Sequence, residues 1–450
     1  MKLVRVVVLF VCSLLPLAVL HSPSHAEMLS DSTESLRFTL ANGLEVRTRS
    51  IPRARGVAIT VAYRAGTLYD PAGREGSAEL LAELAFTAPA GETPSRSREE
   101  MNSIRPIGWG VRTNRRLALL TEVATREQFP GVLRQVAERM RGVKVDDAVL
   151  KQAQLDTRRD QGNRYFGSPD LALYYRSGEL AHGVSDERMI RRASGKGAEG
   201  ITVKDASALL QRLYVPANGV LAVVGDLSGI DIETLVKNEF GAIPAGAAAS
   251  EPASPPFQTG LRAMQWKGLQ HPIGVLAIQA PALEDSLHPS FFLATLVTSA
   301  GLQKNWGGPT PPLSSRFQYS LFDDAELVRF YPPIAPKETD PQGMGEEFSF
   351  RLGELAAISV GADQLDRVRS SVAWLLGAPL TNDLRRRAQA EAGPLGTLGT
   401  SMATRALWRG DVFWDDYLAR FHAQRYGHNN FYGEMDQPAR QFKLLFTPSP

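Results

Sequence analysis

Cysteine is almost absent from this chain, which has one, Cys12, among 450 residues. Cys12 lies in an N-terminal segment that we expect to be removed, so the mature protein would contain no cysteine. Without cysteine the chain can form no disulfide and no cysteine-ligated metal site. Low-complexity tracts are also missing, and 43% hydrophobic with 22% charged residues is typical of a globular protein.

A hydrophobic run long enough to span a membrane is missing too. The apolar run Val6–Leu20 is shorter than the ~20 residues that a membrane-spanning helix needs. Lys2 and Arg5 precede the run, and the small residues of Ser24–Ala26 follow it. This order is typical of a secretory signal peptide. We predict a signal peptide over residues 1–26 and a periplasmic or extracellular protein, with an uncleaved anchor as the alternative.

The chain has no excess of charge of one sign. Its Lys and Arg residues number 50 and its Asp and Glu residues 48. Loss of residues 1–26 would remove two positive charges and no negative ones, which leaves 48 of each sign. No basic stripe with interleaved aromatic residues is present. We therefore expect no nucleic-acid partner.

Hydrophobic patterns in the first half predict strands mixed with helices. Asn42-Gly43 lies between two alternating runs, which is the strongest short signal for a β-hairpin. Further strands are predicted around 56–70, 117–124 and 214–228, and helices around 76–86, 126–142, 145–163 and 232–246.

The segment Pro244–Gly260 is rich in Pro, Ala, Ser and Gly, which indicates a linker. The second half repeats the order of strands and helices after it. A strand at 273–281, a helix at 290–302, a strand and part of a helix in 346–360, and a helix at 362–377 are predicted. At ~150 residues per domain, two or three domains are expected. We predict the α+β class in two similar halves, with domains at 27–245 and 259–450 and a linker at 246–258.

Three stretches of the first half resemble one known family in their order and spacing. They are LANGLEV (40–46), YRAGTLYDPAGREGSAELLAELAF (63–86) and YVPANGVLAVVGDL (214–227). They look like the N-terminal domain of the insulinase/pitrilysin family of inverted zinc metallopeptidases, which includes the mitochondrial processing peptidases and many bacterial proteins. The second half resembles this family through Pro311–Tyr331. The resemblance implies two homologous α+β domains, each a mostly antiparallel sheet packed against helices.

The family's catalytic motif is altered in this chain. In active members the stretch reads G-x-A-H-x-x-E-H, where the two histidines bind zinc and the glutamate is the general base. The resemblance places Glu79, Ala82 and Glu83 at these three positions. Carboxylates are harder ligands that match calcium or magnesium better than zinc. Ala82 has no group that can take a proton from water.

The other metal ligands of the family are missing as well. The third ligand is a glutamate about 75 residues further on, which falls in Gln154–Asn163. That stretch contains Asp156 and Asp160 but no glutamate. No i, i+4 pair occurs among the five histidines beyond residue 26, which are His182, His271, His288, His422 and His428. We therefore predict no metal ligand, no catalytic residue and no cofactor.

The second half shows a matching loss. Active members, or the partner subunit when the site is shared, carry an arginine and a tyrosine that grip the substrate backbone and the tetrahedral intermediate. Alignment on Arg316 places Phe322 at the arginine position and Arg329 at the tyrosine position. A shifted register would bring Tyr331 close to the tyrosine position. The resemblance therefore implies that both catalytic half-sites are absent.

Glu79 and Glu83 also have a plain structural interpretation. On a helical wheel they lie nearly opposite an apolar arc formed by Leu80, Leu81, Leu84 and Ala85. We expect an acidic helix face exposed to solvent. A salt bridge to an arginine such as Arg74, or a bound divalent cation, is the alternative.

Three functions are compatible with these residues. The leading one is a non-catalytic insulinase-like subunit that pairs with an active chain carrying H-x-x-E-H and holds peptide by strand addition. The second is a stand-alone extracytoplasmic peptide-binding or scaffold protein. The third is a metalloendopeptidase that uses Glu79, Glu83 and an aspartate with an unconventional metal. After signal cleavage we expect no membrane span.

Overall fold

The computed structural model describes most of the chain, namely residues 35–305, 316–332, 340–356, 362–424, 435 and 437–448. The predicted signal peptide, His428 and the first part of Pro311–Tyr331 lie outside these ranges. None of the helices in the described ranges combines the length and the hydrophobicity that crossing a bilayer requires.

The first sheet has six strands in the order β1-β2-β6-β3-β5-β4. Its strands are β1 (Ser35–Thr39), β2 (Glu45–Ser50), β3 (Val57–Tyr63), β4 (Trp109–Thr113), β5 (Ala118–Ala124) and β6 (Gly219–Gly225). Only β2 and β6 run parallel. The predicted hairpin is confirmed, because β1 pairs antiparallel with β2. Gly43 in its turn has φ of +83°, which glycine adopts without steric cost.

The second sheet has five strands in the order β7-β11-β8-β10-β9. Its strands are β7 (Gly260–Trp266), β8 (Ile273–Gln279), β9 (Arg316–Ser320), β10 (Asp324–Tyr331) and β11 (Gln441–Pro448). Only β11 and β7 run parallel. Two mostly antiparallel sheets with helices on them confirm the predicted α+β class.

Helices from the same half cover one face of each sheet. On the first sheet they are α1 (Ser77–Thr87), α2 (Arg98–Ile104), α3 (Phe129–Arg141), α4 (Asp147–Gly162), α7 (Lys196–Glu199), α8 (Val203–Leu213) and α9 (Ile232–Phe240). On the second sheet they are α10 (His288–Asn305) and α11 (Pro341–Ala356). Packed against α10 are α12 (Ala362–Ala373) and α15 (Asp411–Ala423). Single turns lie at Thr67–Tyr69, Asn163–Gly167, Pro216–Asn218, Trp374–Leu376 and Pro438–Arg440.

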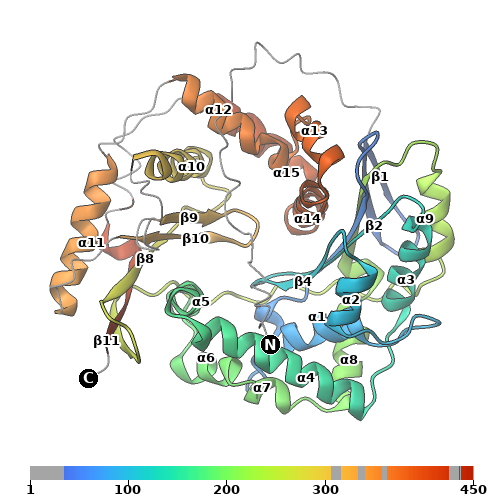
Figure 1. Cartoon of the computed structure of the whole chain (residues 1–450), viewed down its shortest axis with the longest axis horizontal. Coiled ribbons are helices and arrows are strands. Elements are labelled where there is room, and N and C mark those ends of the chain that lie inside the picture. Colours follow the sequence, from blue (N-terminus) through green and yellow to red (C-terminus); the bar gives the residue numbers. More distant parts are fainter. Residues whose placement is uncertain are drawn as a thin grey trace, which may run out of the picture.

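The other face of each sheet is covered by helices from the opposite half of the chain. From the second half, α13 (Asn382–Ala390) and α14 (Gly393–Trp408) pack on the first sheet. From the first half, α5 (Pro169–Ala181) and α6 (Asp186–Ala193) pack on the second sheet. Figure 1 shows α14 between the two sheets and α5 beside the second one. The hydrophobic core on this second face of each sheet therefore combines residues from both halves.

The predicted strand within 346–360 is wrong over the described residues. The segment up to Ala356 is the helix α11, and residues 357–361 lie outside the described ranges. Met344, Phe348 and Leu352 are four residues apart and are all buried against the second sheet. This spacing fits a helix and not a strand.

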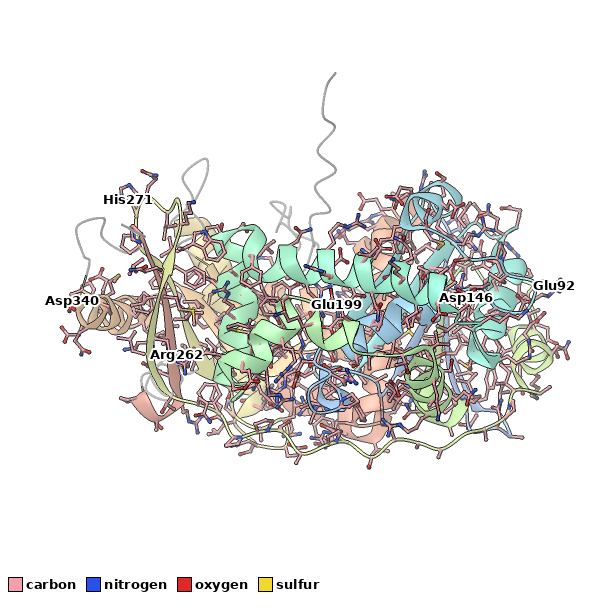
Figure 2. The ribbon with its side chains drawn as sticks, turned by 90° about the horizontal axis from the view of Figure 1, so that it is seen from below. Glu92, Asp146, Glu199, Arg262, His271 and Asp340 are labelled. Carbon is pink, nitrogen blue, oxygen red and sulfur yellow. The ribbon has the colours of Figure 1, made fainter. Side chains whose placement is uncertain are left out.

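The molecule is elongated, with one sheet toward each end. Figure 2 shows Arg262 and His271 at the end that holds the second sheet, and Asp146 and Glu92 at the other. Residues 244–259 between the halves form neither helix nor strand. The exact domain boundaries stay a prediction, since the exchanged helices join the two halves.

Candidate functional site

The helix α1 carries all three altered motif positions, and its start is fixed by a buried carboxylate. Gly76 precedes the helix with φ of +99°. The carboxylate of Asp70 accepts hydrogen bonds from the backbone N–H groups of Gly76 (2.9 Å) and Ala78 (2.7 Å). These bonds satisfy donors that a helix start otherwise leaves unpaired. A negative charge at this end also interacts favourably with the helix dipole.

The predicted solvent-exposed acidic face of α1 is wrong. The exposed fraction of Glu83 is 3%, and that of the Glu79 side chain is 13%. The helix α4 packs against α1 and, with α2, covers the face that the helical wheel leaves polar. Because carboxylates are seldom buried without partners, each glutamate needs a nearby cation. The salt-bridge alternative is therefore the correct one, although the partners are Arg98 and Arg192 rather than Arg74.

Arg98 lies between two carboxylates. Its Nε and Nη2 atoms donate to the two oxygens of Glu83, at 3.2 and 2.7 Å, and its Nη1 atom is 2.6 Å from Oδ2 of Asp160. Burial lowers the pKa of Arg98, but hydrogen bonds and charge from Glu83 and Asp160 outweigh burial and raise it. Asp160 comes from the stretch in which the third ligand was expected. Asp156 from that stretch instead pairs with Arg159, at 2.7 Å.

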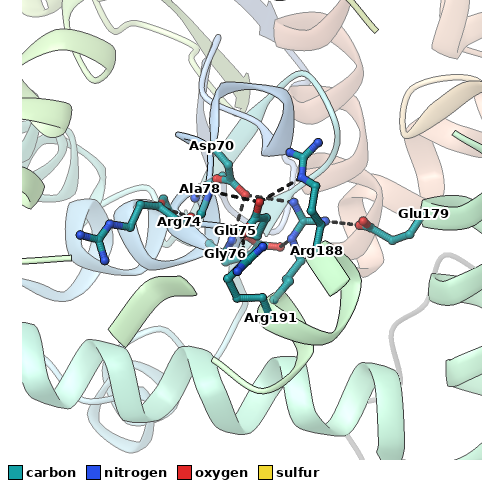
Figure 3. A network of polar contacts seen from close by, with 12 residues as sticks. Asp70, Arg74, Glu75, Gly76, Ala78, Glu179, Arg188 and Arg191 are labelled. Atoms are coloured by element: carbon teal, nitrogen blue, oxygen red, sulfur yellow. Dashed lines mark hydrogen bonds and ion pairs between the residues drawn. The ribbon is translucent and has the colours of Figure 1, made fainter. Parts of the chain in front are cut away.

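Arg192 on α6 is the second buried cation of the site. Its Nη2 atom is 2.9 Å from Oδ2 of Asp70, its Nη1 atom bonds Glu179, and its Nε atom is 3.9 Å from Oε1 of Glu79. Burial lowers the pKa of Arg192, but these carboxylates outweigh burial and raise it. Burial raises the pKa of Asp70 to about 7, against the opposing effect of Arg192. Figure 3 shows Asp70 and Glu179 in this network.

The loop before α1 is tied to α6 by a further buried glutamate. Nε of Arg188 and Nε of Arg191 lie 2.9 and 2.7 Å from the two oxygens of Glu75 (Figure 3). Burial raises the pKa of Glu75, but hydrogen bonds from both arginines lower it overall. Sequence reasoning missed this network. Its signal is the arginine-rich stretch of α6, Arg188 to Arg192, whose partners become evident only from the tertiary structure.

A small pocket opens beside these ion pairs. It is called the α1–α4 pocket below. Its lining residues are Glu79, Glu83, Arg98, Val111, Thr113, Thr157, Asp160, Gln161 and Arg164. Thr157 and Gln161 were not predicted, although their spacing places them on one face of α4 together with Asp160.

The donor set at the altered motif does not fit a zinc ion. Structural and catalytic zinc sites use histidine and cysteine ligands with few carboxylates, and here only carboxylates are near. The guanidinium of Arg98 lies between Glu83 and Asp160, where its charge opposes a divalent cation. Within the described ranges, no group of three or more His, Cys, Asp or Glu side chains is placed to hold a metal ion.

Phe322 and Arg329 are structural parts of the second half. The Phe322 carbonyl accepts a hydrogen bond from Nδ2 of Asn114, at 3.1 Å. Arg329 is buried, with its Nη2 atom 3.2 Å from Oδ2 of Asp324 and its guanidinium 4.3 Å from the Tyr174 ring centre on α5. Tyr331 is buried in the core between the second sheet and α5. None of these three aligned residues lines the α1–α4 pocket.

Comparison with known proteins adds evidence on the fold. No protein-family model and no curated protein sequence matches this chain. A protease from Helicobacter pylori has a TM-score of 0.71 at 16% identity, covering 92% of this chain and 99% of that one. The periplasmic protease PqqL of Escherichia coli has a TM-score of 0.66 at 13% identity, covering 94% and 48%.

A third similar structure is a peptidase M16 inactive domain from Pseudomonas fluorescens. Its TM-score is 0.64 at 12% identity, and the match covers 92% of this chain and 98% of that one. Identities this low support a statement about fold alone. The predicted resemblance is confirmed at that level, and the chain has the two-domain fold of the M16, or insulinase-like, peptidases.

Proposed function

We propose that this chain is a non-catalytic insulinase-like subunit that binds extended peptide beside an active zinc peptidase. The observation that carries the proposal is the altered motif. Glu79, Ala82 and Glu83 stand at the ligand and base positions, and Arg98 lies between Glu83 and Asp160. No side chain at position 82 can activate water. Arg98 pairs with Glu83, and Arg192 lies 3.9 Å from Glu79, so the two glutamates have cationic neighbours without a metal ion.

The strand β4 supports the peptide-binding part of the proposal. It lies at the end of the first sheet, next to β5 only. An edge strand presents backbone groups that can pair with an added extended chain. Val111 and Thr113 of β4 also line the α1–α4 pocket. A peptide added to β4 would therefore pass the mouth of that pocket.

The two-domain layout supports the partner part of the proposal. Both sheets and their covering helices are intact, so the chain can supply half of a peptide chamber without doing chemistry. The partner would be a chain of the same fold that carries H-x-x-E-H. This chain would be exported through its predicted signal peptide, and the partner would be exported to the same compartment. A stable complex should bury well over ~1,000 Å².

Co-expression with such a peptidase tests the proposal. We expect a heterodimer by size-exclusion chromatography and faster hydrolysis of a fluorogenic peptide than the partner achieves alone. The isolated chain should contain far less than one zinc ion per chain and show no chelator-sensitive hydrolysis. A monomer without effect on the peptidase would favour a stand-alone binding protein. Stoichiometric zinc, with hydrolysis abolished by Glu79→Ala, would instead favour the metalloendopeptidase.

A further inference from the structure

Three side chains in the α1–α4 pocket are buried without hydrogen-bond partners. The atoms concerned are Oε2 of Glu79, Oγ1 of Thr157, and both Oε1 and Nε2 of Gln161. Thr157 is 3% exposed and Gln161 is 1% exposed. Buried polar groups are paired in the great majority of cases. This cluster therefore offers hydrogen bonds to whatever group occupies the pocket, water included.

The charge of the pocket restricts what that group can be. Three carboxylates and two guanidinium groups line the pocket. Arg192 lies 3.9 Å from Glu79 but also pairs with Asp70 and Glu179, so part of the negative charge at Glu79 stays uncompensated. Water could satisfy the hydrogen bonds but would not balance this charge. A small anion is disfavoured for the same reason. A divalent cation would lie close to Arg98, which already bridges Glu83 and Asp160.

The hydrogen-bonding capacity of the cluster matches a primary ammonium group. An ammonium carries one positive charge and three donors. The unpaired oxygens of Glu79, Thr157 and Gln161 are three acceptors, contributed by the facing helices α1 and α4. The amide nitrogen of Gln161 is left to donate to a neighbouring carbonyl, such as that of a peptide backbone.

We infer that the α1–α4 pocket binds the primary ammonium group of a peptide, which is either its N-terminal amine or a lysine side chain. The inference rests on the proposed peptide-binding function and adds the chemical group that is recognised. Val111 and Thr113 place the edge of β4 at the same pocket. A peptide paired with β4 could thus deliver its amine to Glu79.

Isothermal titration calorimetry of the mature chain with synthetic peptides tests the inference. One C-terminally amidated sequence would be made in three forms: with a free N-terminus and no lysine, N-acetylated without lysine, and N-acetylated with one lysine. We expect at least about tenfold weaker binding of the form without an amine, because hydrogen bonds between charged groups are lost. The two amine-bearing forms distinguish the N-terminal from the lysine source.

Substitutions in the pocket provide the second arm. Glu79→Gln should weaken binding of the preferred peptide about tenfold or more. Glu99→Gln, on the exposed surface of the adjacent α2, is the matched charge control and should leave binding unchanged. Gln161→Leu and Thr157→Val remove groups that have no partner in the free protein. Both substitutions should therefore weaken peptide binding without lowering the thermal unfolding midpoint. An unchanged midpoint would show that the variants are folded and that weaker binding is not caused by misfolding.

Two results would overturn the inference without deciding the proposed function. Equal binding of all three peptide forms would show that the ammonium is not recognised, while peptide binding itself would stand. No binding of any form would also overturn it, and a gain in the partner's peptidase activity on adding this chain would still support the subunit role.

Discussion

Replacing Arg98 with methionine tests whether this arginine is what allows the altered motif to be buried. The substitution keeps an unbranched side chain at the first position of α2 and removes the guanidinium. Glu83 would lose two hydrogen bonds, from Nε and Nη2, and Asp160 would lose its ion pair. Glu83 is 3% exposed and cannot turn to water without moving α1.

The size of the loss follows from burial. Removing one partner of a fully buried ion pair costs about 3–5 kcal/mol, because a charge is left uncompensated. The side chains of Arg98 and Asp160 are each 29% exposed. Water therefore partly screens the ion pair between them, and its loss lowers the stability little. We expect Arg98→Met to lower the free energy of unfolding by about 3 kcal/mol, nearly all of it through Glu83.

Urea denaturation of a double-mutant cycle measures this energy. Arg98→Met, Glu83→Gln and the double variant would be compared with the unmodified chain. The double variant should recover much of the loss, because no charge is then left alone. A loss below about 0.5 kcal/mol, as for ordinary surface substitutions, or strict additivity in the cycle would refute the reasoning.

Two further predictions concern the second half of the chain. Burial lowers the pKa of His288 to about 4, from about 6.5 in the unfolded chain. As the pH drops, the unfolded state therefore takes up the proton before the folded state does. The free energy of unfolding should fall by about 3 kcal/mol between pH 6.5 and pH 4. His288→Gln should flatten that part of a plot of stability against pH. In α14, a Cβ at Gly399 would lie 2.8 Å from Oγ1 of Thr60, whereas one at Gly396 would lie 3.8 Å from Cγ2 of Thr121. Gly399→Ala should therefore lower the urea midpoint through overpacking. Gly396→Ala should raise the urea midpoint, because alanine favours a helix over glycine by up to about 1 kcal/mol of unfolding free energy.

Local patterns predicted much of the fold but not how the two halves interlock. The hairpin around Gly43 and the helix of Glu79 follow from short-range signals. Every residue of β3 (Val57–Tyr63) and of β6 (Gly219–Gly225) is buried, which indicates that both faces of the first sheet are covered. The sequence does not identify the helix that covers the second face, because α14 lies far along the chain and reaches this sheet only through tertiary packing.

The candidate site was predicted in position and misjudged in environment. The family spacing placed Asp160 near Glu83, and the structure joins them through Arg98. A helical wheel treats a carboxylate as a sign of exposure, which holds only where no cation is available to pair with it. Arg98 and Arg192 come from two other helices, so neither could be assigned from the pattern of α1 alone.

The arginines also bear on what it would take to restore a metal to this fold. Writing histidine at 79 and 83 and glutamate at 82 would supply two zinc ligands and a base. The change at position 83 would also remove the carboxylate that pairs with Arg98. The guanidinium of Arg98, still paired with Asp160, would then lie beside the intended metal. Zinc affinity would therefore depend on position 98 as much as on the motif itself. In this arrangement the guanidinium of Arg98 supplies positive charge beside Glu83, at the place where the resemblance to the insulinase-like peptidases would put a zinc ion.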